Sequence, residues 1–104
     1  MRKPPILTEE ARAAALSKAR ESRAHRAKIK AEVRAGELSV EQVIERANTD
    51  EVVSKMRVSE LLESISGVGK VRAVSILDRL GISRTRRIMG LGTHQRTALI
   101  KEFA

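Results

Sequence analysis

The chain has 104 residues, enough for one small domain, and its net charge of +8 gives a pI of about 10.8. It contains no cysteine, and His25 and His94 lack the spacing of ligands on one helix, so we expect no disulfide, no metal site and no cofactor. The apolar runs are short and the first seven residues lack an apolar segment, which predicts a cytoplasmic protein without a membrane span or secretory signal.

The charged side chains are unevenly distributed along the sequence. Residues 1–35 carry ten basic and four acidic side chains, residues 36–64 carry three and seven, and residues 65–104 carry eight and two. Two ends of net charge +6 therefore flank a middle of net charge −4. This pattern favours a polyanionic partner such as a nucleic acid. A membrane surface fits less well, because the basic N-terminal stretch has few large apolar residues to insert.

The sequence predicts an all-α fold that begins with a long helix. Phe103 is the one aromatic residue, and apolar and polar residues do not alternate over any length, so strands are not expected. Thr8 is suited to cap a helix, and Glu9 and Glu10 suit its first turn. The alanine-rich basic run that follows reaches Gly36, which is suited to the position after a helix end.

Six basic residues of this first helix fall within one arc of about 120° on a helical projection. They are Arg12, Arg20, Arg23, Arg26, Lys30 and Arg34. We expect Ile29 and Val33 to lie roughly opposite that arc and to dock the end of the helix on the core. The earlier turns have little to bury, so residues 1–35 are predicted to form an arm ordered by phosphates, with Arg20 and Arg23 as contacts. A solvated alanine-rich helix is the alternative.

Residues 36–104 are predicted to form a compact helical domain. The first expected helix runs from a Ser39 cap to about Ala47, and a short helical stretch follows the Asn48–Asp50 turn. The next runs from a Ser59 cap to Ile65. The last two run from Gly69 to Leu80, before Gly81, and from a Thr93 cap to Phe103. The expected core is aliphatic throughout: Val40, Val43, Ile44, Val52, Val53, Met56, Val58, Leu61, Leu62, Ile65, Val71, Val74, Ile76, Leu77, Leu80, Ile82, Ile88, Leu91, Leu99 and Ile100.

One segment, Ile-Ser-Gly-Val-Gly-Lys-Val-Arg-Ala over residues 65–73, has the pattern of the hairpin in helix-hairpin-helix and helix-two-turn-helix proteins. Its glycines permit positive φ and a close approach of the backbone to a phosphate, and the apolar residue between them pins the turn to the core. The N–H groups that open the next helix attract an anion, and basic side chains flank them. The candidate phosphate-binding residues are Ile65, Ser66, Gly67, Val68, Gly69, Lys70, Val71 and Arg72. A plain helix-connecting turn would share the glycines, whereas a Walker A loop would need Ser or Thr at residue 71.

A second basic cluster follows between the last two predicted helices. Its arginines, hydroxyls and glycines, together with an arginine of the last helix, are further candidate phosphate contacts. These residues are Ser83, Arg84, Thr85, Arg86, Arg87, Gly90, Gly92, Thr93 and Arg96. The alternative is that these arginines form a solvated surface.

In these features the chain resembles the actinobacterial integration host factors, from about Leu7 to Phe103. The matching segments are Leu7-Thr8 before the basic helix, Lys55–Ser59, Leu61–Glu63, Gly67–Ala73, Leu80–Ile82, Thr85–Arg87 and Gly90–Gly92. The resemblance implies a helix-two-turn-helix fold that binds double-stranded DNA with little sequence preference, bends or loops it, and supports phage integration and compaction. It also implies a second DNA-contacting segment, a lid, at residues 83–95.

We expect duplex DNA as the partner and a monomeric protein. The resemblance further implies a phage integrase that acts through the same DNA and a location in the nucleoid. Whether one monomer holds two duplexes is left open. Two residues depart from the family pattern. Ser66 stands where the family commonly has proline, so the loop is expected to be less rigid, and Met89 stands where a further arginine is common, so one lid contact is expected to be absent.

Three other functions are weighed against DNA binding. A pure protein–protein adaptor would not explain two ends of net charge +6 around a middle of −4. A small-subunit ribosomal protein carries the same two-turn motif and binds RNA, but it usually has a long, very basic C-terminal tail, and this chain ends at Glu102-Phe103-Ala104. A DNA glycosylase also uses this motif, but Lys70 and Asp78 do not reproduce a catalytic pair, and a pocket for a flipped base is hard to form in so small a core. We therefore expect no enzymatic activity.

Overall fold

The computed structural model describes residues 8–104, and in this range the chain is helical and forms no strand. The elements are α1 (Glu9–Arg34), α2 (Val40–Arg46), α3 (Glu51–Lys55), α4 (Val58–Ser64), α5 (Lys70–Leu80), the 3₁₀ helix η1 (Ile88–Gly90) and α6 (Thr93–Glu102). The predicted all-α fold is confirmed. Residues 1–7 lie outside the described residues. The predicted arm begins with them, and the predicted absence of a secretory signal rests on them.

Helices α1 and α2 begin at their predicted caps, and α3 begins directly after the predicted Asn48–Asp50 turn. Thr8 Oγ1 accepts from the Ala11 N–H at 3.0 Å at the start of α1. Ser39 and Gln42 form the predicted capping box of α2, and the Asp50 carboxylate accepts from the N–H of Val53 at 3.2 Å at the start of α3. A side chain local in sequence thus satisfies each of these helix starts.

Two predicted caps are wrong by one or two residues. Helix α4 begins at Val58, so Ser59 lies inside its first turn. The Val58 N–H instead donates to the carbonyl of Arg86 at 2.9 Å, within an isolated antiparallel bridge between Arg57 and Arg87. Helix α6 begins at Thr93 itself, after Gly92. A contact between distant segments therefore sets the start of α4, which local capping rules could not reveal.

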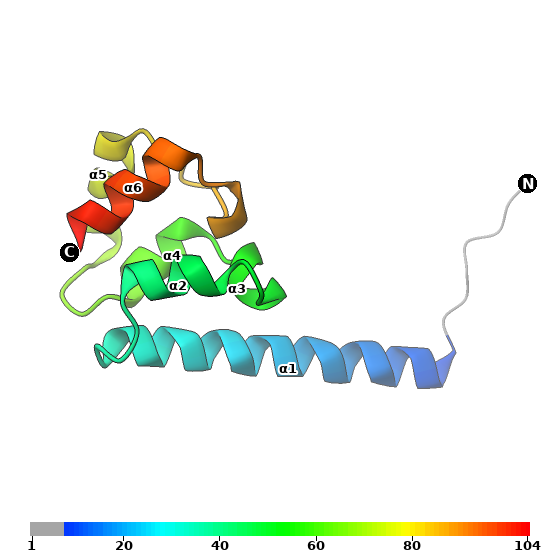
Figure 1. Cartoon of the computed structure of the whole chain (residues 1–104). Helices are drawn as coiled ribbons and strands as arrows, with labels where there is room; N and C mark the ends of the chain where they lie inside the picture. Colours follow the sequence, from blue (N-terminus) through cyan, green and yellow to red (C-terminus); the bar gives the residue numbers. More distant parts are fainter. Residues whose placement is uncertain (1–7) are drawn as a thin grey trace, which may run out of the picture.

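The core lies between the end of α1 and the shorter helices (Figure 1). Ile29 and Val33 are buried, as predicted, and attach α1 to the domain. The earlier turns of α1 extend beyond the other helices (Figure 1), and Leu16 there is 57% exposed. Most of the predicted aliphatic residues are buried, but Val71 is 86% exposed, so its place in the predicted core is wrong. Ala73, Ile76 and Leu77 form the inner face of α5 instead.

The basic arc of α1 does not lie opposite the buried residues, contrary to the prediction. Arg26 is half-buried and faces α3, where it lines a pocket with Glu51 and Lys55. Lys30 Nζ lies 3.7 Å from the carboxylate of Glu60 on α4. The acidic middle of the sequence therefore packs beside part of the basic arc and neutralises some of its charge.

Candidate nucleic-acid interface

The turn between α4 and α5 is built around one glycine with positive φ. The Val68 N–H donates to the carbonyl of Ile65 at 3.0 Å, and Gly67 between them has φ of 84°. Positive φ at the third residue is the requirement of a type II turn, and glycine meets it without strain. Val68 is buried and Ile65 half-buried, so these two apolar residues anchor the turn, while Ser66 and Gly67 stay exposed.

Gly69 opens α5, as predicted, but it does not have the positive φ that was expected of the glycines in this turn. Its φ is −88°, so its backbone is ordinary, and a Cβ built on it would have no heavy atom within 4 Å. It is the N-cap of α5, and no side chain in residues 8–104 accepts a hydrogen bond from this helix start. The N–H groups of the first turn of α5 therefore point out of the helix without a partner from the described protein.

The side chains in the first turn of α5 are basic or apolar, and they are exposed. Lys70, Val71 and Arg72 form the first turn of α5, and the buried Ala73 follows them. Glu102 of α6 is the nearby acid, and a hydrogen bond from Arg79 at 2.7 Å lowers its pKa, with a smaller contribution from Arg72. The start of α5 combines unpaired N–H donors, the positive end of a helix dipole and two cations, which suits a phosphate.

The predicted lid begins with a tight turn after α5. The Ser83 Oγ accepts from the N–H of Thr85 at 3.3 Å and lies 3.0 Å from the Thr85 hydroxyl, and the Arg86 N–H donates to the Ser83 carbonyl. Arg84 Nη2 lies 3.3 Å from the exposed carboxylate of Asp78. The hydroxyls of this turn are therefore engaged in local bonds, and Arg84 shares its charge with an acid.

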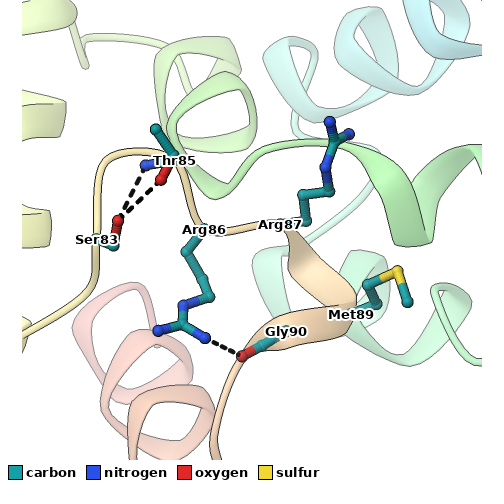
Figure 2. A pocket seen from close by; sticks show the side chains of 6 residues that line it. All are labelled: Ser83, Thr85, Arg86, Arg87, Met89 and Gly90. Atoms are coloured by element: carbon teal, nitrogen blue, oxygen red, sulfur yellow. Dashed lines mark hydrogen bonds between the residues drawn. The ribbon is translucent and has the colours of Figure 1, made fainter.

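The next two arginines point in opposite directions from the loop (Figure 2). Arg86 Nη1 folds back and donates to the carbonyl of Gly90 at 3.1 Å. Arg87 Nη1 donates to the carbonyl of Lys55 on α3. Both side chains are exposed, so each guanidinium keeps further donors toward solvent while one donor holds the loop in shape.

The lid surface has a shallow hollow of about 440 Å³. It is lined by Ser83, Thr85, Arg86, Arg87, Met89 and Gly90 (Figure 2). Met89, which stands in place of a common arginine, is 64% exposed. The bridge to Arg87 brings the exposed Arg57 beside this cluster. Arg57 was not among the predicted contacts, because the pairing joins residues thirty positions apart and no local pattern signals it.

The start of α6 is a second helix N-terminus with a glycine cap. The Gly92 N–H donates to Gln95 Oε1 at 3.0 Å, and Gln95 Nε2 donates to the carbonyl of Gly81 at 2.9 Å. Gln95 thus ties this helix start to the end of α5. Thr93 and Arg96 are exposed on the first turn of α6, and Arg20 and Arg23 are exposed on α1.

The candidate residues therefore fall into three surfaces rather than one. The first is the start of α5 with its turn, the second is the lid with the start of α6, and the third is the exposed part of α1. Nothing in residues 8–104 groups three or more histidine or acidic side chains as metal ligands, and no helix in that range is long and apolar enough to cross a membrane.

Comparisons with known proteins identify relatives over almost the whole chain. The family model described as an S13-like H2TH domain matches residues 33–103. The chain is 50% identical to the integration host factor of Streptomyces coelicolor over 99 residues, which are 95% of this chain and 92% of that protein. It is 48% identical to the integration host factor of Mycobacterium tuberculosis over 95% of this chain and 94% of that protein.

A solved structure is similar in fold as well as in sequence. The structure described as sIHF bound to an 8-bp palindromic DNA has a TM-score of 0.83 and 45% identity to this chain. The match covers 85% of this chain and 99% of that one.

Proposed function

Because the chain belongs to the actinobacterial integration host factor family, we propose that it binds double-stranded DNA through the phosphate backbone and organises the chromosome. The observation that carries this proposal is the start of α5, where unpaired N–H groups meet Lys70 and Arg72 on an exposed surface. The similar structure of sIHF, which is bound to DNA, supports the same function. The role is non-catalytic: the protein holds and shapes DNA and changes no bond in it.

Backbone binding follows from the kinds of groups that the three surfaces offer. Main-chain N–H groups and basic side chains contact phosphates in any sequence, whereas reading bases needs side chains that reach base edges in a groove. We expect different DNA sequences to bind within about tenfold of one another. The basic surfaces lie on separate elements, α1, α5 and the lid. We propose that DNA that contacts more than one of them is bent or looped.

The proposal also covers the partners of the protein and its location in the cell. We propose that the protein works as a monomer in the nucleoid. It supports site-specific recombination by bending or looping the DNA on which a phage integrase acts. The lid and the α5 start offer contacts to two duplexes at once. The division into an arm of residues 1–35 and a domain of residues 36–104 is part of this proposal. The exposed early turns of α1 support it, and Ile29 and Val33 mark where the arm would join the domain.

The test is a filter-binding titration of the protein with duplex DNA, structured RNA and single-stranded DNA, repeated over a range of salt concentrations. If six to eight phosphates are neutralised, the slope of log K against log salt should be roughly −5 to −7 for the duplex. A slope of about −1, or a hundredfold preference for one DNA site, would contradict backbone binding. Tighter binding to structured RNA than to duplex DNA would favour the ribosomal type of function instead.

A further inference from the structure

A pocket between α1 and α3 collects basic side chains that are not among the DNA contacts named above. It measures about 210 Å³ and is lined by Lys18, Ser22, Arg26, Glu51, Val52 and Lys55. Lys18, Ser22 and Arg26 are spaced four residues apart along α1, so they form one stripe that faces α3. Arg20 and Arg23 lie elsewhere on the circumference of the helix and are exposed.

The charges in this pocket do not balance. Three cationic side chains meet one carboxylate, that of Glu51, which lies 2.7 Å from Lys55 Nζ. The hydrogen bond from Lys55 lowers the pKa of Glu51, and the charges of Lys55 and then Lys18 lower it further. One acid and one base therefore pair within α3, which leaves Lys18 and Arg26 of α1 in excess.

Arg26 carries the argument, because one of its donors has no partner. Its Nε is inaccessible to solvent and has no hydrogen-bond acceptor among residues 8–104. Buried donors are almost always satisfied, and a guanidinium donor left unpaired away from water is unfavourable. Arg26 also lines the pocket, where an anion could accept from its other guanidinium donors and offset its charge.

We propose that the pocket between α1 and α3 binds a phosphate group, with Arg26, Lys18 and Lys55 as cations and Ser22 as a hydroxyl donor. The site is distinct from the α5 start and does not depend on the proposed function. It lies beside the lid, because the carbonyl of Lys55 accepts from Arg87. The phosphate can come from a DNA backbone that passes the lid or from a free phosphorylated molecule.

The experiment is an NMR titration of the whole chain with inorganic pyrophosphate, at ionic strength held constant with chloride. We expect saturating shifts of the backbone amides of Ser22, Arg26 and Lys55. The Arg26→Gln variant should bind about tenfold more weakly, since it loses a charge-assisted contact. Lys18 is exposed, so Lys18→Gln serves as a second variant that keeps the fold, with a smaller loss of affinity. Arg34→Gln, an exposed cation of α1 outside the pocket, is the matched control and should leave the affinity unchanged.

Linear, non-saturating shifts, or equal affinity in the Arg26→Gln, Lys18→Gln and Arg34→Gln variants, would overturn the site. Addition of a 12-bp duplex then separates the sources of phosphate. Displacement of pyrophosphate by the duplex assigns the pocket to the DNA backbone, and undisturbed pyrophosphate binding assigns it to a free ligand. A Gly69→Asp variant that loses DNA binding should still bind pyrophosphate, so the two proposals fail separately.

Discussion

The helices of the N-terminal half begin differently from the two long helices of the C-terminal half. Thr8, Ser39 and Asp50 each close a helix start with their own side chain, at α1, α2 and α3. Helices α5 and α6 begin after Gly69 and Gly92, which have no side chain to offer. In each of the first three helices a cap side chain accepts from an N–H of the first turn, whereas no side chain in residues 8–104 does so at the start of α5, which lies beside basic side chains. Changes to the capped starts should therefore affect stability, and changes to the open start should affect binding.

The sharpest test of this comparison is to close the open start with a carboxylate. In Gly69→Asp, the new side chain caps α5 and occupies the proposed phosphate position. We expect DNA affinity to fall about 100-fold, or about 3 kcal/mol, through loss of charge-assisted hydrogen bonds and through repulsion. Stability should be unchanged or slightly higher, because Gly69 has negative φ, its Cβ position is free and aspartate is a good N-cap. Gel shifts and thermal melts measure the two effects.

The matched control for this variant is Ser39→Asp, which adds the same charge at a start that is already capped. DNA affinity should fall by less than about threefold in this control, because distant exposed charges are screened. An equal loss in both variants would mean that net charge alone governs binding, and the α5 start would have no special role.

The arginines of the lid should affect both DNA binding and stability. Replacing Arg86 and Arg87 together with alanine should weaken DNA binding by about 1–3 kcal/mol. Each side chain also donates to a main-chain carbonyl, so we expect a loss of stability of about 1 kcal/mol, although both are exposed. Binding isotherms and urea melts separate the two losses. Unchanged DNA binding would leave these arginines with a structural role only.

The same variant tests whether the lid contacts a second duplex. If it does, the Arg86→Ala/Arg87→Ala protein should still bind one short duplex but lose DNA looping in single-molecule imaging. A parallel loss of both would favour one continuous DNA surface.

At a capped start, the expected effect is on stability and depends on pH. Burial raises the pKa of Asp50, but hydrogen bonds from His25 and the Val53 N–H outweigh it, so the pKa lies below its ordinary value of 3.8. The stability that follows is present above pH 3.8 and is lost as the pH falls through the lowered value. Asp50→Ala should cost about 1 kcal/mol at pH 7 and less in acid, by thermal melts. Asp50→Asn keeps a cap, so it should lose the part of the acid dependence that comes from Asp50, and its DNA affinity at pH 7 should stay within about threefold.

The smallest expected effect concerns the turn that leads to the open start. Ser66 occupies the second position of a type II turn, where proline is common, and the ψ of 131° at Ile65 suits a residue before proline. Ser66→Pro should therefore raise the free energy of unfolding by about 0.4–1 kcal/mol by restricting the unfolded chain, with little change in DNA affinity. Gly67→Ala is the contrasting control and should destabilise the protein, because φ there is 84°. Destabilisation by Ser66→Pro in urea melts would show that the turn does not accept proline.

Local sequence patterns determined much of this protein. The caps at Thr8, Ser39 and Asp50, the helix end at Gly81 and the positive φ of Gly67 involve groups within a few residues of one another, so their patterns are visible in the sequence. The all-α class follows from the same local preferences. The family resemblance also came from the sequence, because its landmarks occur in order along the chain.

Only the tertiary structure decided which residues face which neighbours. The bridge of Arg57 with Arg87 moved the start of α4 away from the Ser59 cap, and it brought Arg57 to the lid. Val71 fits an apolar pattern but lies on the outer face of α5, since Ala73, Ile76 and Leu77 already fill the inner face. Arg26 looked like part of an exposed basic arc, yet α3 packs against it and forms a pocket. In each case the deciding partner is distant in sequence, and helical periodicity gives the direction of a side chain only relative to its own helix.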